Sequence, residues 1–119
     1  MDTSLITHWH SKIRALFPNH AEFKFPLAGA ANLFAIDWKL NTDAARPNKG
    51  SRQINIHFST EAVEDYLAST EAKQSQADGR LQRFVAAQLA QFTPDHDARA
   101  DQVPPAVTWV VTTAILNGP

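Results

Sequence analysis

The sequence contains no cysteine and only four glycines among its 119 residues. Without cysteine the chain can form no disulfide, no thiolate zinc site and no cysteine nucleophile. So few glycines leave no Gly-rich loop of the kind that cradles phosphate groups. No serine stands in a Gly-x-Ser-x-Gly nucleophile elbow either. The chain therefore lacks the common sequence signatures of covalent and nucleotide-dependent catalysis.

An excess of one charge and long apolar runs are also missing. Eleven Lys and Arg residues stand against twelve Asp and Glu residues, so the formal net charge is −1. A balanced chain has no global field to attract a polyanion, so nucleic-acid binding would need its basic residues gathered on one face. No apolar run approaches a membrane span, and the N-terminus lacks the basic start and apolar core of a signal peptide. We therefore expect a cytoplasmic protein with no membrane partner.

The hydrophobic content indicates a folded domain. Hydrophobic residues make up 44% of the chain and include seven Phe and three Trp. That is enough apolar surface to offset the entropy of ordering the chain. The length is near that of one ordinary domain, and no internal repeat or low-complexity tract is present. We predict a single domain over residues 1–119.

Three segments in the first half of the chain alternate apolar and polar residues, which is typical of strands. They cover residues 23–27, 32–40 and 51–58, and the third is the clearest. A short turn precedes the second segment and a polar loop of about ten residues precedes the third. Connections of this kind favour an antiparallel meander.

Helical periodicity appears before and after these strands. It covers residues 4–17, then residues 60–67 behind Ser59, which stands where a helix N-cap is expected. A further helix carries apolar residues from Leu81 to Phe92. Residues 69–76 have a weaker signal and are either a frayed continuation of the earlier helix or a linker.

Residues 106–116 are β-rich and apolar on both faces, which suits an interior strand. A polar, proline-rich loop over residues 95–105 precedes them. The predicted fold is therefore α+β in the order α-β-β-β-α-α-β. Its four-stranded, mostly antiparallel sheet packs against the helices.

Surplus apolar residues in the predicted sheet indicate an interface. Leu33 and Ala35 lie on the outer face of their strand, and the last strand is apolar on both faces. An uncovered apolar sheet face usually marks a contact surface. The predicted interface consists of Val107, Trp109, Val111, Leu33 and Ala35. The alternative is that the N-terminal helix covers this face and leaves a monomer.

Acid and imidazole groups provide the only other candidate site. Asp95, His96 and Asp97 form the one acid–imidazole cluster, and His57 lies on the outward face of its strand. The cluster lacks the glycine hinge and closing glutamate of a calcium loop, and a solvated loop is the favoured explanation for it. We predict no catalytic residue, no metal and no cofactor, and we keep these four residues as a speculative polar site.

The order helix, three strands, helix resembles that of double-stranded-RNA-binding domains. That resemblance implies lysines at the start of the second helix, where this chain has Glu61, Glu64 and Asp65, which would repel phosphate. The same order opens the fold of type III secretion chaperones, which dimerise and hold a client. Those chaperones are more acidic and continue with two strands and a final helix, so this chain departs from them as well.

These observations favour a small non-catalytic cytosolic protein that acts through protein–protein contact, with a homodimer as one form of it. The alternative is a small-molecule-binding protein or enzyme with a pocket between sheet and helices, to which His57 or Trp109 would contribute. Nucleic-acid binding is the third hypothesis, and it rests on Arg46, Lys49 and Arg52, which cluster in and after the loop before the third strand.

Overall fold

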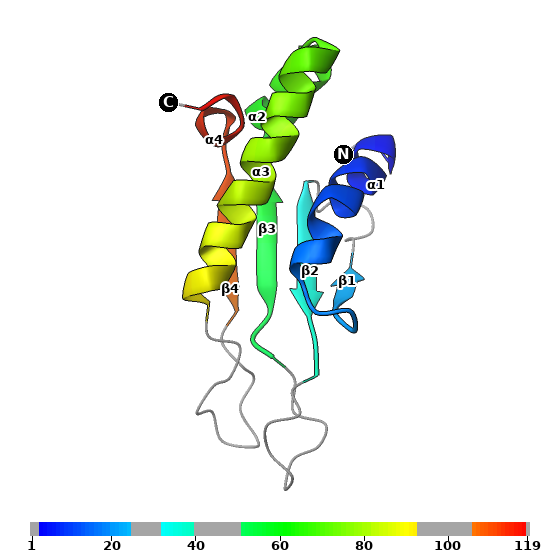
Figure 1. Cartoon of the computed structure of the whole chain (residues 1–119), viewed down its shortest axis with the longest axis vertical. Helices are drawn as coiled ribbons and strands as arrows, with labels where there is room; N and C mark the ends of the chain where they lie inside the picture. Colours follow the sequence, from blue (N-terminus) through cyan, green and yellow to red (C-terminus); the bar gives the residue numbers. More distant parts are fainter. Residues whose placement is uncertain (1–2, 25–31, 40–50, 93–105, 119) are drawn as a thin grey trace, which may run out of the picture.

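A computed structural model describes residues 3–24, 32–39, 51–92 and 106–118 of the chain. Figure 1 shows the elements that these residues form. The elements are α1 Thr3–Ile13, the 3-10 turn η1 Arg14–Leu16, β1 Glu22–Lys24, β2 Leu33–Asp37, β3 Ile54–Phe58, α2 Thr60–Ala68, α3 Glu71–Gln91, β4 Val107–Val111 and α4 Thr113–Asn117. None of the helices described is both long and apolar enough to cross a membrane.

The four strands form one sheet in the order β1-β2-β3-β4. β2 pairs antiparallel with both β1 and β3, whereas β4 lies parallel to β3. The parallel pair requires a crossover between its strands, and this connection contains both α2 and α3. The predicted α+β fold and its order of elements are confirmed, and the sheet is mixed, with two antiparallel pairs and one parallel pair.

α1 and α3 lie across the same face of the sheet (Figure 1). The strand period of two therefore sends alternate side chains toward these helices. In β3, Ile54, Ile56 and Phe58 are fully buried, while Asn55 is partly buried and His57 is exposed. The helix layer thus covers one face of the sheet, which we call the covered face, and the opposite side is the open face.

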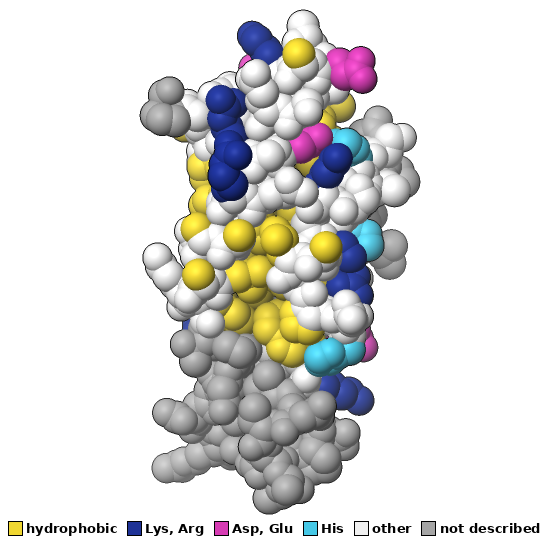
Figure 2. Space-filling model, viewed as in Figure 1, with side chains coloured by type: hydrophobic (Ala, Val, Ile, Leu, Met, Phe, Trp, Pro, Cys, Tyr) yellow, Lys and Arg dark blue, Asp and Glu magenta, His cyan; other side chains and the backbone are white. Residues whose placement is uncertain are grey.

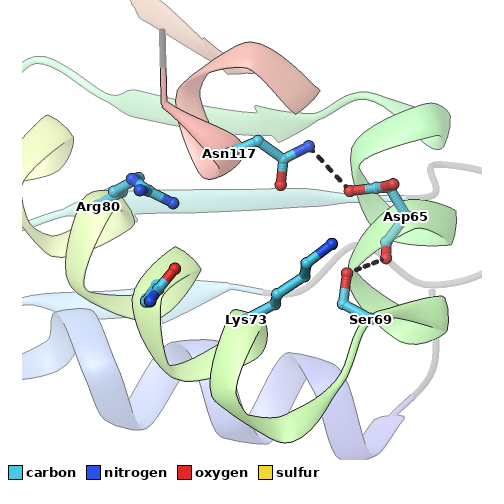
Figure 3. A pocket seen from close by; sticks show the side chains of 6 residues that line it. Asp65, Ser69, Lys73, Arg80 and Asn117 are labelled. Atoms are coloured by element: carbon cyan, nitrogen blue, oxygen red, sulfur yellow. Dashed lines mark hydrogen bonds between the residues drawn. The ribbon is translucent and has the colours of Figure 1, made fainter.

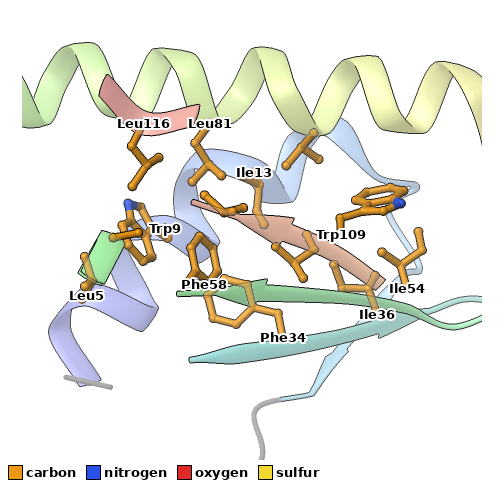
Figure 4. Packing of buried hydrophobic residues seen from close by; sticks show 14 of the residues in the cluster. Leu5, Trp9, Ile13, Phe34, Ile36, Ile54, Phe58, Leu81, Trp109 and Leu116 are labelled. Atoms are coloured by element: carbon orange, nitrogen blue, oxygen red, sulfur yellow. The ribbon is translucent and has the colours of Figure 1, made fainter. Parts of the chain in front are cut away.

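Aromatic rings join the helix layer to the sheet. The ring of Trp9 on α1 stacks on Phe58 with centroids 4.3 Å apart, and it meets Tyr66 of α2 edge-on at 5.0 Å. Figure 4 shows apolar side chains from the helices and the sheet converging on this layer. Each fully buried large side chain stabilises the fold by about 1.5–3 kcal/mol relative to an exposed one. The largest of them are Trp9, Phe34, Phe58, Ile13, Ile36, Ile54, Ile56, Leu81, Val85 and Val111.

Hydroxyl caps set where α2 and α3 begin. The Ser59 side chain accepts a hydrogen bond from the N–H of Ala62 at 3.1 Å, which confirms the predicted N-cap. The Thr70 side chain accepts from the N–H of Lys73 in the same way at 3.3 Å. α3 therefore starts at Glu71, and most of the segment 69–76 is helix and not a linker.

The C-terminal segment differs from its prediction. β4 ends at Val111, and residues 113–117 form α4, where the sequence pattern predicts strand up to Leu116. β-branched and apolar residues are compatible with either structure over so short a run. The chain leaves α4 through Gly118, whose φ of 81° is a conformation that glycine adopts without steric cost. Leu116 is buried as part of this helix, which packs against α2 and α3.

Candidate interaction surface

β4 is an edge strand of the sheet formed by the described residues, and it pairs on one side only. The N–H of Val107 donates to the carbonyl of Gln53 at 2.9 Å, so the odd-numbered residues of β4 bond to β3. The N–H and C=O groups of Thr108 and Val110 consequently point away from β3. Two donors and two acceptors lie along this side of the strand, which we call the β4 edge. Such a row can pair with a further strand.

The sequence of β4 has none of the features that usually protect an edge strand from pairing. The strand reads Val-Thr-Trp-Val-Val from 107 to 111, with no charge, proline or glycine. Edge strands usually carry lysine, proline or a bulge, which discourage pairing with another chain. Val110 is 47% exposed, one of the more exposed large apolar residues that the structure describes. Among the residues that the structure describes, no strand pairs with the β4 edge, and Val110 is exposed beside it.

The open face continues from this edge as cross-strand rows. Leu33 of β2, His57 of β3 and Val110 of β4 occupy the same register. The neighbouring row runs from Ala35 on β2 to Thr108 on β4. Neither row carries a carboxylate or an ammonium group on β2, β3 or β4. The half of the open face beside the β4 edge therefore has no Asp, Glu, Lys or Arg side chain on these three strands.

Charged side chains on the open face gather at its other end. Lys24 of β1 and Asp37 of β2 form an ion pair with 3.4 Å between Nζ and Oδ2. Glu22 lies opposite Asp37 in the β1–β2 register. Charge thus accumulates beside β1, whereas the β4 side has none to repel an apolar partner.

The residues predicted to form an interface divide between the two faces. Val107, Trp109 and Val111 are directed toward the helices, and Trp109 and Val111 are buried there. Leu33 and Ala35 lie on the open face and are partly buried. The structure therefore brings only the last two residues onto one exposed surface.

Val110 is the interface candidate that the sequence prediction left out. Alternation along β4 indicates that Val110 faces opposite to Trp109. Because both faces of this strand are apolar, the pattern alone does not say which of them the helices cover. The exposure of Val110 depends on where α3 lies.

Of the four residues predicted as a polar site, only His57 lies within the described residues, so their grouping stays a prediction. His57 lies on the open face and Trp109 on the covered face, so the two side chains cannot share one pocket. His57 is also excluded from a pocket between the sheet and the helices. Asp95, His96 and Asp97 lie outside the described residues.

The basic residues considered for nucleic-acid binding are placed only in part. Arg46 and Lys49 lie outside the described residues, and the guanidinium of Arg52 lies 5.6 Å from the ring centroid of Phe92. At the start of α2, Glu61 and Glu64 are exposed. A phosphate backbone would meet carboxylates at this position.

A polar cluster that sequence reasoning missed joins the three larger helices. The Asp78 carboxylate of α3 is buried; its Oδ1 accepts a hydrogen bond from the Tyr66 hydroxyl at 2.8 Å, and its Oδ2 lies 2.7 Å from His8 Nε2. Burial raises the pKa of Tyr66, and the neighbouring Asp78 carboxylate raises it further. His8 and Asp78 stand seventy positions apart, so no local spacing reveals their contact.

This cluster satisfies its own polar atoms and needs no ligand. Asp78 has a partner on each carboxylate oxygen, which is the usual condition for burying a charge. Its position ties α1, α2 and α3 together. Over the described ranges, no group of three His, Asp or Glu side chains is arranged to hold a metal ion.

A hollow with polar walls lies between α2, α3 and α4, and we call it the α2–α4 pocket (Figure 3). Its volume is about 300 Å³. Side chains from all three helices line it: Asp65, Ser69, Lys73, Gln76, Arg80 and Asn117. The pocket lies at the helical end of the molecule and shares no residue with the β4 edge.

Comparison with known proteins adds no assignment to these features. No family model, no curated protein and no solved structure matches the chain.

Proposed function

We propose that this chain is a cytoplasmic, non-catalytic interaction module that works as a homodimer joined along its two β4 edges. The observation that carries the proposal is the row of outward N–H and C=O groups on Thr108 and Val110. Backbone groups of this kind pair most directly with another extended strand. A strand without charge or proline leaves that pairing unopposed.

A second copy fits the β4 edge because the edge is complementary to itself. An antiparallel pairing about a two-fold axis at Trp109 sets Thr108 of one copy opposite Val110 of the other. In such a pair each residue both donates and accepts, so the two symmetric pairs give four hydrogen bonds. The same surface is used twice, as in most homodimers.

Side chains on the open face favour the same arrangement. Antiparallel pairing places Val110 beside Thr108 of the second copy and joins the uncharged rows of the two open faces. The charged pair Lys24–Asp37 lies at the far side of the sheet, so no like charges meet at the junction. The sheet would become continuous across the dimer, and both β4 edges would be covered.

The test measures the molar mass by light scattering coupled to gel filtration over a dilution series of the wild type and Thr108→Pro. Proline removes an N–H that β3 does not use, and edge strands tolerate it there. Losing two of the four intermolecular hydrogen bonds should raise the dimer dissociation constant about tenfold or more. The matched control Thr108→Val keeps the N–H group and should dimerise like the wild type.

Circular dichroism and thermal unfolding establish that each variant is folded before its mass is compared. A wild type with the mass of one chain at every concentration contradicts the proposal. So does a dimer that survives Thr108→Pro but dissociates in Leu33→Glu, because it would be joined through the open face and not through the β4 edge.

A further inference from the structure

The α2–α4 pocket contains two cationic side chains on a single helix. Lys73 and Arg80 stand seven residues apart on α3, a spacing that brings both to the same side of the helix. In Figure 3 the ammonium group of Lys73 reaches into the hollow. The two ion pairs found within the described ranges join other groups, so neither contains Lys73 or Arg80.

Arg80 is held in position by the last turn of α4 and by Gly118, which follows it. Its Nη1 donates to the carbonyl of Leu116 at 3.2 Å. Its guanidinium also lies against Gly118, where an added Cβ would come within 2.9 Å of Nε. The glycine therefore leaves room for the guanidinium plane. A guanidinium has five N–H donors, so others remain available for an anionic group after the contact with Leu116.

Basic side chains extend along α3 beyond this pocket. Arg83 lines an adjoining hollow that shares Gln76 and Arg80 with the α2–α4 pocket. Figure 2 shows Lys and Arg side chains gathered over the upper part of α3. Arg83 does not line the α2–α4 pocket itself, which makes it a matched control for general attraction of anions to this side of the helix.

The opposite wall has a different chemistry. Asn117 of α4 donates from Nδ2 to the Asp65 carboxylate at 3.0 Å. Ser69 donates to the backbone carbonyl of Asp65 at 2.7 Å, which directs its hydroxyl group toward α2. The carboxylate has further lone pairs and can accept from ligand hydroxyl groups, but it repels a second anionic group. One wall thus suits an anion and the other suits hydroxyl groups.

We infer that the α2–α4 pocket binds a small phosphorylated polyol. Its phosphate lies between Lys73 and Arg80, which offer charge-assisted hydrogen bonds. Its hydroxyl groups donate to the Asp65 carboxylate and accept from the amide of Asn117. The volume of about 300 Å³ is at the lower end of the range for small-molecule sites and suits a ligand of this size. This site is independent of the proposed dimer, because it shares no residue with the β4 edge.

The experiment is an amide chemical-shift titration of the full chain by NMR, with glycerol 1-phosphate as probe and glycerol and inorganic phosphate as comparisons. We expect saturable shifts around Ser69, Lys73 and Asn117, with glycerol 1-phosphate binding more tightly than either comparison. Lys73→Gln should weaken binding about tenfold or more, the usual effect of losing a charged hydrogen-bond donor. Asp65→Asn should reduce the preference for glycerol 1-phosphate over inorganic phosphate.

Arg83→Gln is the control, and it should leave the affinity for glycerol 1-phosphate unchanged. An equal loss of affinity in Arg83→Gln and Lys73→Gln would overturn the inference, because diffuse attraction to α3 would then explain binding. The absence of saturable shifts around the pocket in the wild type would overturn it as well. Equal affinity for inorganic phosphate and glycerol 1-phosphate would exclude the polyol contacts. None of these results depends on whether the chain dimerises.

Discussion

The two faces of the sheet differ sharply although the same strands form them. On the covered face, β3 presents Ile54, Ile56 and Phe58, which have no exposed surface. On the open face the same strand presents Asn55, which is partly buried, and His57, which is exposed. The helix layer covers only one side of the sheet, which produces this difference. Apolar and polar residues alternate along β3 accordingly.

In β4 the alternation of residue types does not show which face is covered. Its side chains are apolar on both faces, yet Val111 is fully buried while its neighbour Val110 is 47% exposed. An apolar residue on an exposed sheet surface is not needed for the packing of one chain. This contrast between neighbours is what directs attention to the β4 edge as a contact surface.

Substitutions at adjacent positions of β3 test the comparison most directly. Phe58→Ala removes a buried ring that packs against Trp9 and Phe34, and it should lower the free energy of unfolding by about 3–5 kcal/mol. His57→Ala should change it by no more than about 0.5 kcal/mol, because the side chain lies on the open face. Urea denaturation followed by tryptophan fluorescence measures both. Comparable losses at the two positions would mean that the open face is covered in solution.

Asp78 tests whether the helix layer depends on its buried polar contact. Asp78→Ala leaves the Tyr66 hydroxyl without its acceptor and should cost about 1–3 kcal/mol of unfolding free energy. Asp78→Asn keeps a carbonyl oxygen for Tyr66 and should cost less. Denaturant midpoints of the three proteins give the comparison, and an Asp78→Ala variant as stable as the wild type would show that the cluster is dispensable.

Ser59 tests the junction between the sheet and the helix layer, with the smallest expected effect. Its hydroxyl caps α2, while its N–H donates to the carbonyl of Val111 in β4 at 3.0 Å. Ser59→Ala removes only the cap and should cost about 1 kcal/mol. Ser59→Asn supplies another capping oxygen and should restore most of that loss. Thermal unfolding measures both variants, and equal melting temperatures for Ser59→Ala and the wild type would refute a stabilising cap.

Much of the fold could be predicted from local sequence patterns. Alternation identified β2 and β3, helical periodicity identified α1 and the later part of α3, and the N-cap at Ser59 was predicted correctly. These features depend on near neighbours in the chain, so the sequence carries them directly. α4 was missed because a five-residue helix has too few turns to show a period, and its apolar residues suit a strand equally well.

The candidate sites were less predictable because they combine distant segments. The α2–α4 pocket brings Asp65 and Lys73 together with Asn117, and the contact of His8 with Asp78 spans seventy positions. Of the residues predicted for an interface, Trp109 and Val111 proved to be buried beneath the helix layer. No local sequence pattern contains the position of α3. That position decides both which polar residues meet and which residues of β4 are buried.

The sequence by itself determined which residues are apolar, where the strands alternate and which hydroxyl starts α2. Only the tertiary structure decided which face of the sheet is covered, which valine of β4 remains exposed and which polar groups line a common pocket. The physical reason is that alternation and capping are local interactions, whereas burial depends on where a helix from another part of the chain packs. Val110 and Val111 are the same residue type in adjacent positions, and the helix layer on one side of the sheet makes Val111 core and leaves Val110 on the surface.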